Sequence, residues 1–246
     1  MKESGGRCVA VVCPYDAATQ EAVCRAAAEG IARVALVGEA ARISRLDELL
    51  AFSGRVTLVP ATTPEEAASV AVRMVRQGEA DVVMKGLLNT DTLLHAILDK
   101  ACGLLPPGRV LTHVMAAELP GFGRLLFASD VAVIPQPTLD QRWAILGYGA
   151  AVCRAFGIGH PRMALLHYSE KVSERVLHFP DLEAGNLFYK ATTLLCRAPV
   201  AGMLAGAACP VVLSSRSDGA GDKYLSLVFA LFAAARMEGY GRASLS

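Results

Sequence analysis

The feature that most restricts the fold of this chain is a series of short, uninterrupted apolar runs, each followed by a longer segment of helical composition. Runs of this kind occur at 7–13, 34–37, 56–59 and 81–84. A strand that is buried on both faces of a sheet is apolar at every position, and such strands are typical of parallel sheets covered by helices. The alternation therefore predicts right-handed β-α-β units and an α/β fold with a parallel, doubly wound sheet.

The remaining segments complete the expected order of elements. Gly30 ends the first helix, and Thr63-Pro-Glu-Glu66 places a proline in the first turn of another. Helices are expected at 17–30, 40–52, from 63, and at 91–100, 140–156, 187–195 and from 224. Further strands are expected at 110–115, 124–130, 163–168, 176–179, 200–204 and 211–213. Pro135-Gln-Pro137 excludes both helix and regular strand, and marks a candidate domain boundary.

Composition and charge exclude several functional classes. The 246 residues are 53% hydrophobic and 19% charged, which is typical of a well-buried globular protein. A formal net charge of +1 and the lack of a Lys/Arg run give no general attraction to nucleic acid. The apolar run after the N-terminal residues is too short for a signal peptide, and the C-terminal apolar segment 224–237 is shorter than the ~20 residues that span a bilayer. We therefore expect no membrane association.

The cysteines and histidines are not arranged as a metal site. The seven cysteines are scattered without CxxC spacing, and the five histidines show no HxxxH or HExxH pattern. Most of the cysteines have apolar neighbours, so we expect reduced thiols in a cytoplasmic protein and no metal. His113, His167 and His178 lie within apolar strands, where a satisfied core histidine is the expectation.

Polar, glycine-containing loops follow four of the expected strands, at 85–90, 129–137, 180–186 and 214–222. Open α/β sheets bind ligands at the carboxyl ends of their strands. In the last loop, helix N-terminal amides and Arg216 could hold a phosphate. The alternative is an ordinary strand-to-helix turn, in which Asp218 or Asp222 caps the helix and Arg216 is solvated.

Two other loops allow the same pair of interpretations. Gly86 permits close approach of the backbone, and Lys85 with Thr90 could meet an anion. Alternatively, Thr90 or Asp91 caps the following helix and Lys85 lies on the surface. In the loop 180–186, Asp181 or Glu183 could be a cap, and Asn186 could serve only to fix the turn.

With these loops the chain resembles the phosphate acyltransferases, meaning phosphate acetyltransferase and especially phosphate butyryltransferase. The resemblance covers nearly the whole chain in order, through the segments Gly78–Thr90, Leu119–Asp130, Phe179–Lys190 and Pro210–Asp218. The sequence Glu-Ala-Gly-Asn is more similar to the butyryltransferases. The resemblance does not decide between an acetyl and a butyryl substrate.

The resemblance implies two α/β domains on a parallel-sheet fold related to that of isocitrate dehydrogenase, with the active site in the cleft between them. The C-terminal segment returns to the first domain, which gives residues 1–137 plus 205–246 for that domain and 138–204 for a smaller second one. It also implies a homodimer. The activity implied is transfer of a short-chain acyl group between coenzyme A and inorganic phosphate, with coenzyme A as a substrate and with no cofactor, metal or covalent acyl-enzyme.

The resemblance also implies roles for individual residues. Ser215, Arg216 and Asp222 correspond to the catalytic residues: Asp222 would accept the thiol proton, and Arg216 with Ser215 would stabilise charge on the tetrahedral intermediate. Residues expected to bind substrate are Lys85, Gly86, Thr90, Asn186 and Ser214.

The sequence departs from the family pattern at two places. His95 stands where the acetyltransferases carry a phosphate-binding arginine, unless it is only an exposed helix residue. The family has several tens of residues between the segments matching 163–168 and 180–186, whereas this chain has only 169–175 before the next strand, so its second domain is reduced. These departures leave a non-catalytic acyl-CoA-binding or regulatory relative as the alternative. A metal-dependent dehydrogenase is disfavoured, because neither an aspartate cluster nor a GxGxxG turn is found.

Overall fold

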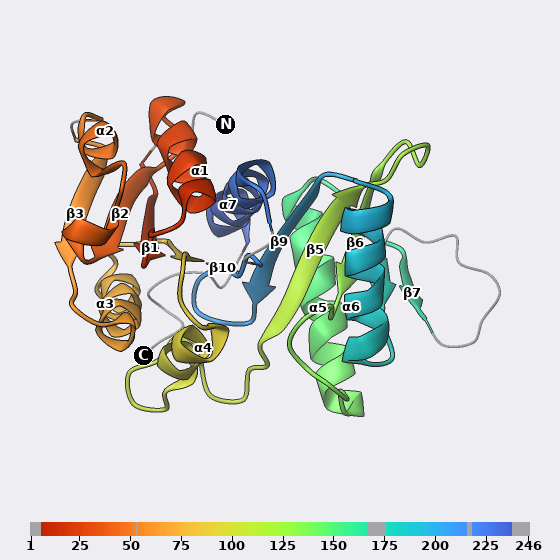
Figure 1. Ribbon diagram of the computed structural model, residues 1–246. Helices are drawn as coiled ribbons and strands as arrows, with labels where there is room; N and C mark the ends of the chain where they lie inside the picture. Colours follow the sequence, from red (N-terminus) through yellow and green to blue (C-terminus); the bar gives the residue numbers. More distant parts are fainter. Residues whose placement is uncertain (1–5, 53, 167–175, 216–217, 238–246) are drawn as a thin grey trace.

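The computed structural model describes residues 6–52, 54–166, 176–215 and 218–237, and in this part of the chain the strands form a single ten-stranded sheet (Figure 1). The strands are β1 (Cys8–Val12), β2 (Arg33–Gly38), β3 (Val56–Pro60), β4 (Val82–Lys85), β5 (Thr112–Glu118), β6 (Leu125–Ser129), β7 (Met163–Leu165), β8 (Val176–His178), β9 (Val200–Ala205) and β10 (Val211–Val212). The helices are α1 (Ala17–Ala28), η2 (Ala40–Arg42), α2 (Leu46–Leu50), α3 (Pro64–Gln77), α4 (Thr90–Leu98), α5 (Leu139–Ala155), α6 (Leu182–Lys190), η3 (Ala191–Leu195) and α7 (Ala220–Arg236).

One half of the sheet is the predicted parallel, doubly wound arrangement. Its order is β3-β2-β1-β4-β10, and all its pairings are parallel. Alternate residues of β1 face opposite layers: Val9 and Val11 pack with α1, α2 and α7, whereas Ala10 and Val12 pack with α3. Burial on both faces explains why these strands are continuous apolar runs.

The other half of the sheet contains the antiparallel pairings. β9 pairs antiparallel with both β10 and β5, and β5 pairs antiparallel with β6, while β8 and β7 continue in parallel. Helix α5 packs on the face that α7 covers, and α6 packs on the opposite face (Figure 1). Because β9 connects the two halves, the sheet is continuous. The division at 137/138 and 204/205 stays a prediction.

Two expected helices differ from the structure. The expected helix 40–52 is two short pieces, η2 and α2. The segment 131–134 lies within the expected loop 129–137, where the Asp130 carboxylate accepts hydrogen bonds from backbone N–H groups and curls the chain into a turn. The helix expected from Leu187 begins at Leu182, because Asp181 caps it: its Oδ1 accepts from the N–H of Ala184 at 2.8 Å.

Candidate active site

A cavity of about 470 Å³ opens beside the carboxyl end of β10. Its walls come from the first residue of α4, the start of β5, the turn after β6, helix α6 with η3, and the segment that joins β10 to α7. These elements come from both halves of the sheet. The position agrees with the rule that ligands bind α/β sheets beyond the carboxyl ends of strands.

Five of the predicted site residues line this cavity: Thr90, Asn186, Ser214, Ser215 and Asp222. They lie on the helices α4, α6 and α7 and on the segment between β10 and α7, so only the fold brings them together. Lys85 and Gly86 are not among the described residues that line it. Arg216 lies outside the described residues, between Ser215 and Asp218.

Asp218 shapes the segment that carries Ser215. Its Oδ2 accepts a hydrogen bond from the Ser215 backbone N–H at 2.7 Å, and its own N–H donates to the Ser215 carbonyl at 3.2 Å. Helix α7 is then capped by Gly219 without a side-chain hydrogen bond, and Asp222 lies in its first turn. The interpretation of Asp218 or Asp222 as the cap is therefore wrong, and the carboxylate of Asp222 faces the cavity at the positive end of the helix dipole.

Tyr189 of α6 reaches this segment from the other side of the cavity. Its hydroxyl lies 3.5 Å from both carboxylate oxygens of Asp218. Burial raises the pKa of Asp218, and the nearby charge of Asp222 raises it further. Burial and the Asp218 charge also raise the pKa of the Tyr189 hydroxyl. Tyr189 is therefore a neutral donor next to a carboxyl group whose ionisation is disfavoured.

A glycine sets the position of α6. A Cβ at Gly185 would lie 2.3 Å from the Asp130 carbonyl oxygen and 3.0 Å from Val131 Cα. Only a glycine allows the helix to approach the turn after β6 so closely. This contact places Asn186 and Tyr189 at the cavity wall. It gives a structural reason for the glycine in the Glu-Ala-Gly-Asn segment.

His113 is a cavity residue that the sequence did not reveal. The residue is only 4% exposed and lines the cavity, yet its Nδ1 has no hydrogen-bond partner among the described residues. The expectation of a satisfied core histidine is wrong here. For His178 the expectation is only half met: its Nδ1 lies 2.9 Å from the Ser129 carbonyl oxygen, but its buried Nε2 has no partner among the described residues. His167 lies outside the described residues.

Lys85 and Gly86 belong to the interior next to the site. Lys85 is 3% exposed, so its placement on the surface is wrong. Its Nζ lies 3.5 Å from the Gly86 carbonyl oxygen. A Cβ at Gly86 would lie 2.3 Å from the Cys13 carbonyl oxygen, so the close approach expected of this glycine is to the chain after β1. Binding of substrate by these two residues stays a prediction.

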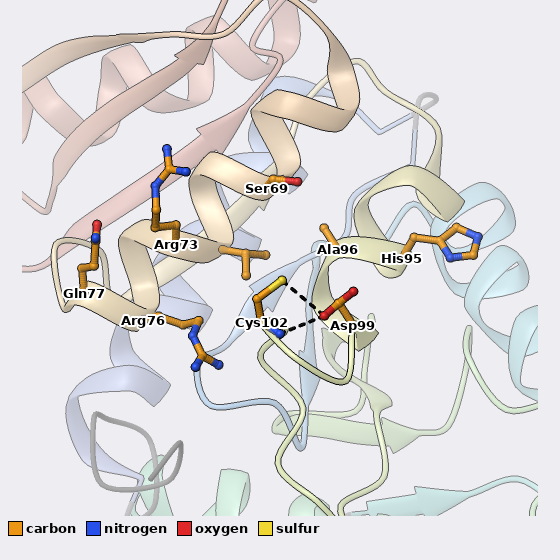
Figure 2. A pocket seen from close by; sticks show the side chains of 9 residues that line it. Ser69, Arg73, Arg76, Gln77, His95, Ala96, Asp99 and Cys102 are labelled. Carbon is orange, nitrogen blue, oxygen red and sulfur yellow. Dashed lines mark hydrogen bonds between the residues drawn. The ribbon is translucent and has the colours of Figure 1, made fainter.

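His95 lines a different cavity, of about 510 Å³, between α3 and α4 (Figure 2). Arg73, Arg76 and Cys102 also line it, and the Cys102 thiol lies 3.2 Å from Asp99 Oδ1. Figure 2 shows the imidazole of His95 pointing away from the two arginines. His95 is exposed and is not among the described residues that line the cavity of Ser215.

Neither a metal-binding cluster nor a membrane-spanning helix is found in the described part of the chain. No group of three or more His, Cys, Asp or Glu residues there is placed to hold a metal ion. Among the same residues, no helix combines the length and the apolar character needed to cross a membrane.

Comparison with known proteins decides the family. The family model described as phosphate acetyl/butaryl transferase matches residues 56–177. A probable phosphate butyryltransferase from Bacillus subtilis (strain 168) is 30% identical over 278 aligned residues, which cover 92% of this chain and 92% of that protein. The chain belongs to the phosphate acetyl/butyryl transferase family. A phosphate acetyltransferase from Thermotoga maritima is 28% identical over 287 residues, covering 95% and 97% of the two chains.

The fold of this family is also confirmed by a solved structure. The branched-chain phosphotransacylase from Enterococcus faecalis V583 superimposes with a TM-score of 0.81 at 23% identity, covering 93% of this chain and 99% of that one. Both sequence alignments are longer than the 246 residues of this chain. Each of these two transferases therefore contains residues that this chain lacks, in agreement with a reduced version of the family fold.

Proposed function

We propose that this protein transfers a short-chain acyl group between coenzyme A and inorganic phosphate. One observation carries the proposal: in a member of this enzyme family, the cavity gathers Ser215, Asp222, Asn186 and Thr90 from separate elements. Phosphate attacks the thioester carbonyl carbon, a tetrahedral intermediate forms, and breakage of the C–S bond releases the acyl phosphate and the thiolate of coenzyme A.

The side chains supply the proton transfer and the charge stabilisation. In the direction of acyl-CoA synthesis the thiol must lose its proton, and an ordinary thiol pKa near 8.5 leaves only a minority ionised at neutral pH. The Asp222 carboxylate accepts this proton, directly or through a water. The Ser215 hydroxyl donates to the oxyanion of the intermediate, and Arg216 binds the phosphate. Neither a metal nor a cofactor takes part in these steps.

A non-catalytic acyl-CoA-binding protein is the second candidate. The specific observation in its favour is the shorter chain, since the aligned transferases contain residues that this protein lacks. If the lacking residues include part of the coenzyme A side of the cleft, binding could persist without turnover.

A thioester assay separates the two candidates. We expect loss of acetyl-CoA or butyryl-CoA that depends on added phosphate and yields acyl phosphate, trapped as the hydroxamate. Arsenate should replace phosphate and give thioester hydrolysis, because acyl arsenates decompose in water. A series of acyl-CoA substrates from two to six carbons would identify the preferred chain. Calorimetric binding of coenzyme A without any phosphate- or arsenate-dependent turnover would favour the non-catalytic candidate.

We further propose that the protein acts in the cytoplasm as a homodimer. All seven cysteines are free thiols, which agrees with a reducing compartment. Leu139 and Trp143 of α5 are 70% and 67% exposed, an apolar pair that a second copy could cover. Light scattering of the protein and of Trp143→Glu tests this: a dimer that dissociates in the variant supports it, and a monomeric native protein contradicts it.

A further inference from the structure

Two buried polar atoms without partners lie on the same cavity. Nδ1 of His113 and Oγ of Ser214 make no hydrogen bond in the described part of the chain, although both residues are at least nine-tenths buried, at 4% and 8% exposure. Both residues line the cavity of Ser215. An unsatisfied buried polar group is costly, and each one in a native protein needs an explanation. A ligand group that enters the cavity would provide the partner.

The imidazole of His113 is not a cation under ordinary conditions. Burial lowers its pKa to about 4, although the nearby charge of Asp130 acts in the opposite direction. The Asp130 carboxylate is itself occupied by backbone N–H groups, including that of His113 at 3.2 Å. The other ring near the imidazole is Tyr189, edge-on at 6.4 Å between centroids. A neutral imidazole offers one donor and one acceptor, and no charge for a phosphate.

Apolar and polar residues both line the cavity. Val131 and Leu213 are apolar, and Leu213 directly precedes Ser214 in the chain, whereas Lys190 at the end of α6 supplies a cation. Because neither His113 nor Ser214 carries a charge, this pair suits an uncharged ligand group such as a carbonyl, and a phosphate is better matched by the cationic lysine.

We propose that His113 and Ser214 hold the thioester carbonyl of the acyl-CoA substrate, with the acyl chain against Val131 and Leu213. This assignment of His113 and Ser214 rests on the proposed function. It places the uncharged part of the substrate at one end of the cavity. His113 and Ser214 bind the carbonyl oxygen in the ground state, and Ser215 contributes when that oxygen becomes an oxyanion. Tyr189 orients the imidazole by edge-on packing.

Gly202 in the neighbouring strand leaves the space that this imidazole occupies. Gly202 of β9 pairs next to β5, and a Cβ there would lie 2.6 Å from His113 Cε1 and 2.7 Å from Nε2. The ring therefore lies directly over a glycine. Its position is fixed by the sheet on one side and by Tyr189 on another, which is the rigidity that a positioning group requires.

Binding of acetyl-CoA and of free coenzyme A, measured by calorimetry without phosphate, tests the proposal independently of turnover. Free coenzyme A has no carbonyl at this end, so its affinity provides the reference. We expect Ser214→Ala and His113→Phe each to weaken the binding of acetyl-CoA roughly tenfold, as for loss of one hydrogen bond. The affinity for free coenzyme A should not change. His113→Gln, which retains a donor and an acceptor, should recover part of the loss. In turnover assays KM for phosphate should not change.

The control is His178→Phe, which alters another buried histidine that is not among the residues lining the cavity. It should leave the ratio of the two affinities at its native value, whatever it does to stability. The proposal would be overturned if Ser214→Ala and His113→Phe weakened the binding of acetyl-CoA and of coenzyme A equally. It would also be overturned if both variants kept the native affinities. A His113→Phe variant that binds better than His113→Gln would overturn it as well, because that order indicates packing only. A native protein that binds neither ligand would contradict the proposed function instead.

Discussion

Lys223 of α7 donates a hydrogen bond to Asp16 at the start of α1, with 3.0 Å between Nζ and Oδ1. The same Nζ lies 3.0 Å from Thr19 Oγ1. The lysine is only 3% exposed and directly follows Asp222, so the pair fixes the first turn of α7 against α1 (Figure 1). Residues 207 positions apart in the chain thus hold the helix that carries the candidate proton acceptor.

Removing one charge of this pair should destabilise the fold, and the two partners should differ. Asp16→Asn keeps a good helix cap but leaves Lys223 buried without a counterion, so we expect a loss of about 3 kcal/mol in the free energy of unfolding. Lys223→Met should cost less, because the Asp16 carboxylate is partly exposed and still accepts from Thr19. Urea unfolding measures both. Equal stability losses, or a larger loss for Lys223→Met than for Asp16→Asn, would contradict the assignment of the buried charge to Lys223.

The same pair predicts a pH dependence of stability. Burial by itself would raise the pKa of Asp16, but hydrogen bonds from Thr19 and Lys223 bring it below the ordinary value of 3.8. The folded state therefore binds this proton less readily than the unfolded state. The contribution of the pair should be complete above 3.8 and should disappear as the pH falls below it. Asp16→Asn should lose stability less steeply than the native protein between pH 5 and pH 3.

Gly185→Ala should damage the site through a steric clash. The new Cβ would lie 2.3 Å from the Asp130 carbonyl oxygen, so α6 must move and take Asn186 and Tyr189 with it. We expect a loss of about 1–3 kcal/mol in stability and a decrease of at least tenfold in kcat/KM. Gly147→Ala in α5 is the matched control, because nothing lies within 4 Å of its Cβ and alanine favours helix. Equal effects of the two substitutions would refute the close-approach argument.

Asp222→Asn tests the proton acceptor. The substitution removes the carboxylate but keeps size and polarity, and Gly219 remains the cap of α7. If Asp222 accepts the thiol proton, turnover should fall roughly 10²–10⁴-fold and the carboxylate limb of the pH profile should weaken. Asp140→Asn, in the first turn of the equally long α5, is the control and should behave as the native enzyme. Native kinetics of Asp222→Asn between pH 5 and pH 9 would exclude the role.

Arg216→Lys should not behave as a conservative change. Lysine retains the charge but loses the planar, two-pronged geometry that suits phosphate. We expect a hundredfold or larger loss in kcat/KM, about 3 kcal/mol of transition-state stabilisation, with little change in stability. The control is Arg124→Lys in the exposed segment between β5 and β6, outside the described lining of the cavity. Near-native kinetics of both Arg216→Lys and Arg216→Gln would remove Arg216 from the reaction centre.

The sequence was sufficient for the order of strands and helices in the parallel half of the sheet. Runs such as 8–12 and 82–84 are apolar at every position because both of their faces are covered, and that signal is local. Motif resemblance was likewise sufficient for the family, because a handful of loop segments carry recognisable residues in the same order along the chain. Helix α6 could have been placed correctly as well, since Asp181 is a recognisable cap ahead of it.

The tertiary structure decided what the sequence could not. The antiparallel pairing of β9 with β5 and β10 is set by packing of distant segments, and no local pattern encodes it. The same holds for His113: its apolar neighbours predict burial, but whether its buried Nδ1 meets a partner depends on residues far away in the chain. The apolar runs of the sequence predicted the buried strands, whereas the burial of Lys85 followed only from the fold. Only the pairing of strands determined which buried groups face the cavity of Ser215, because that depends on which distant segments become neighbours.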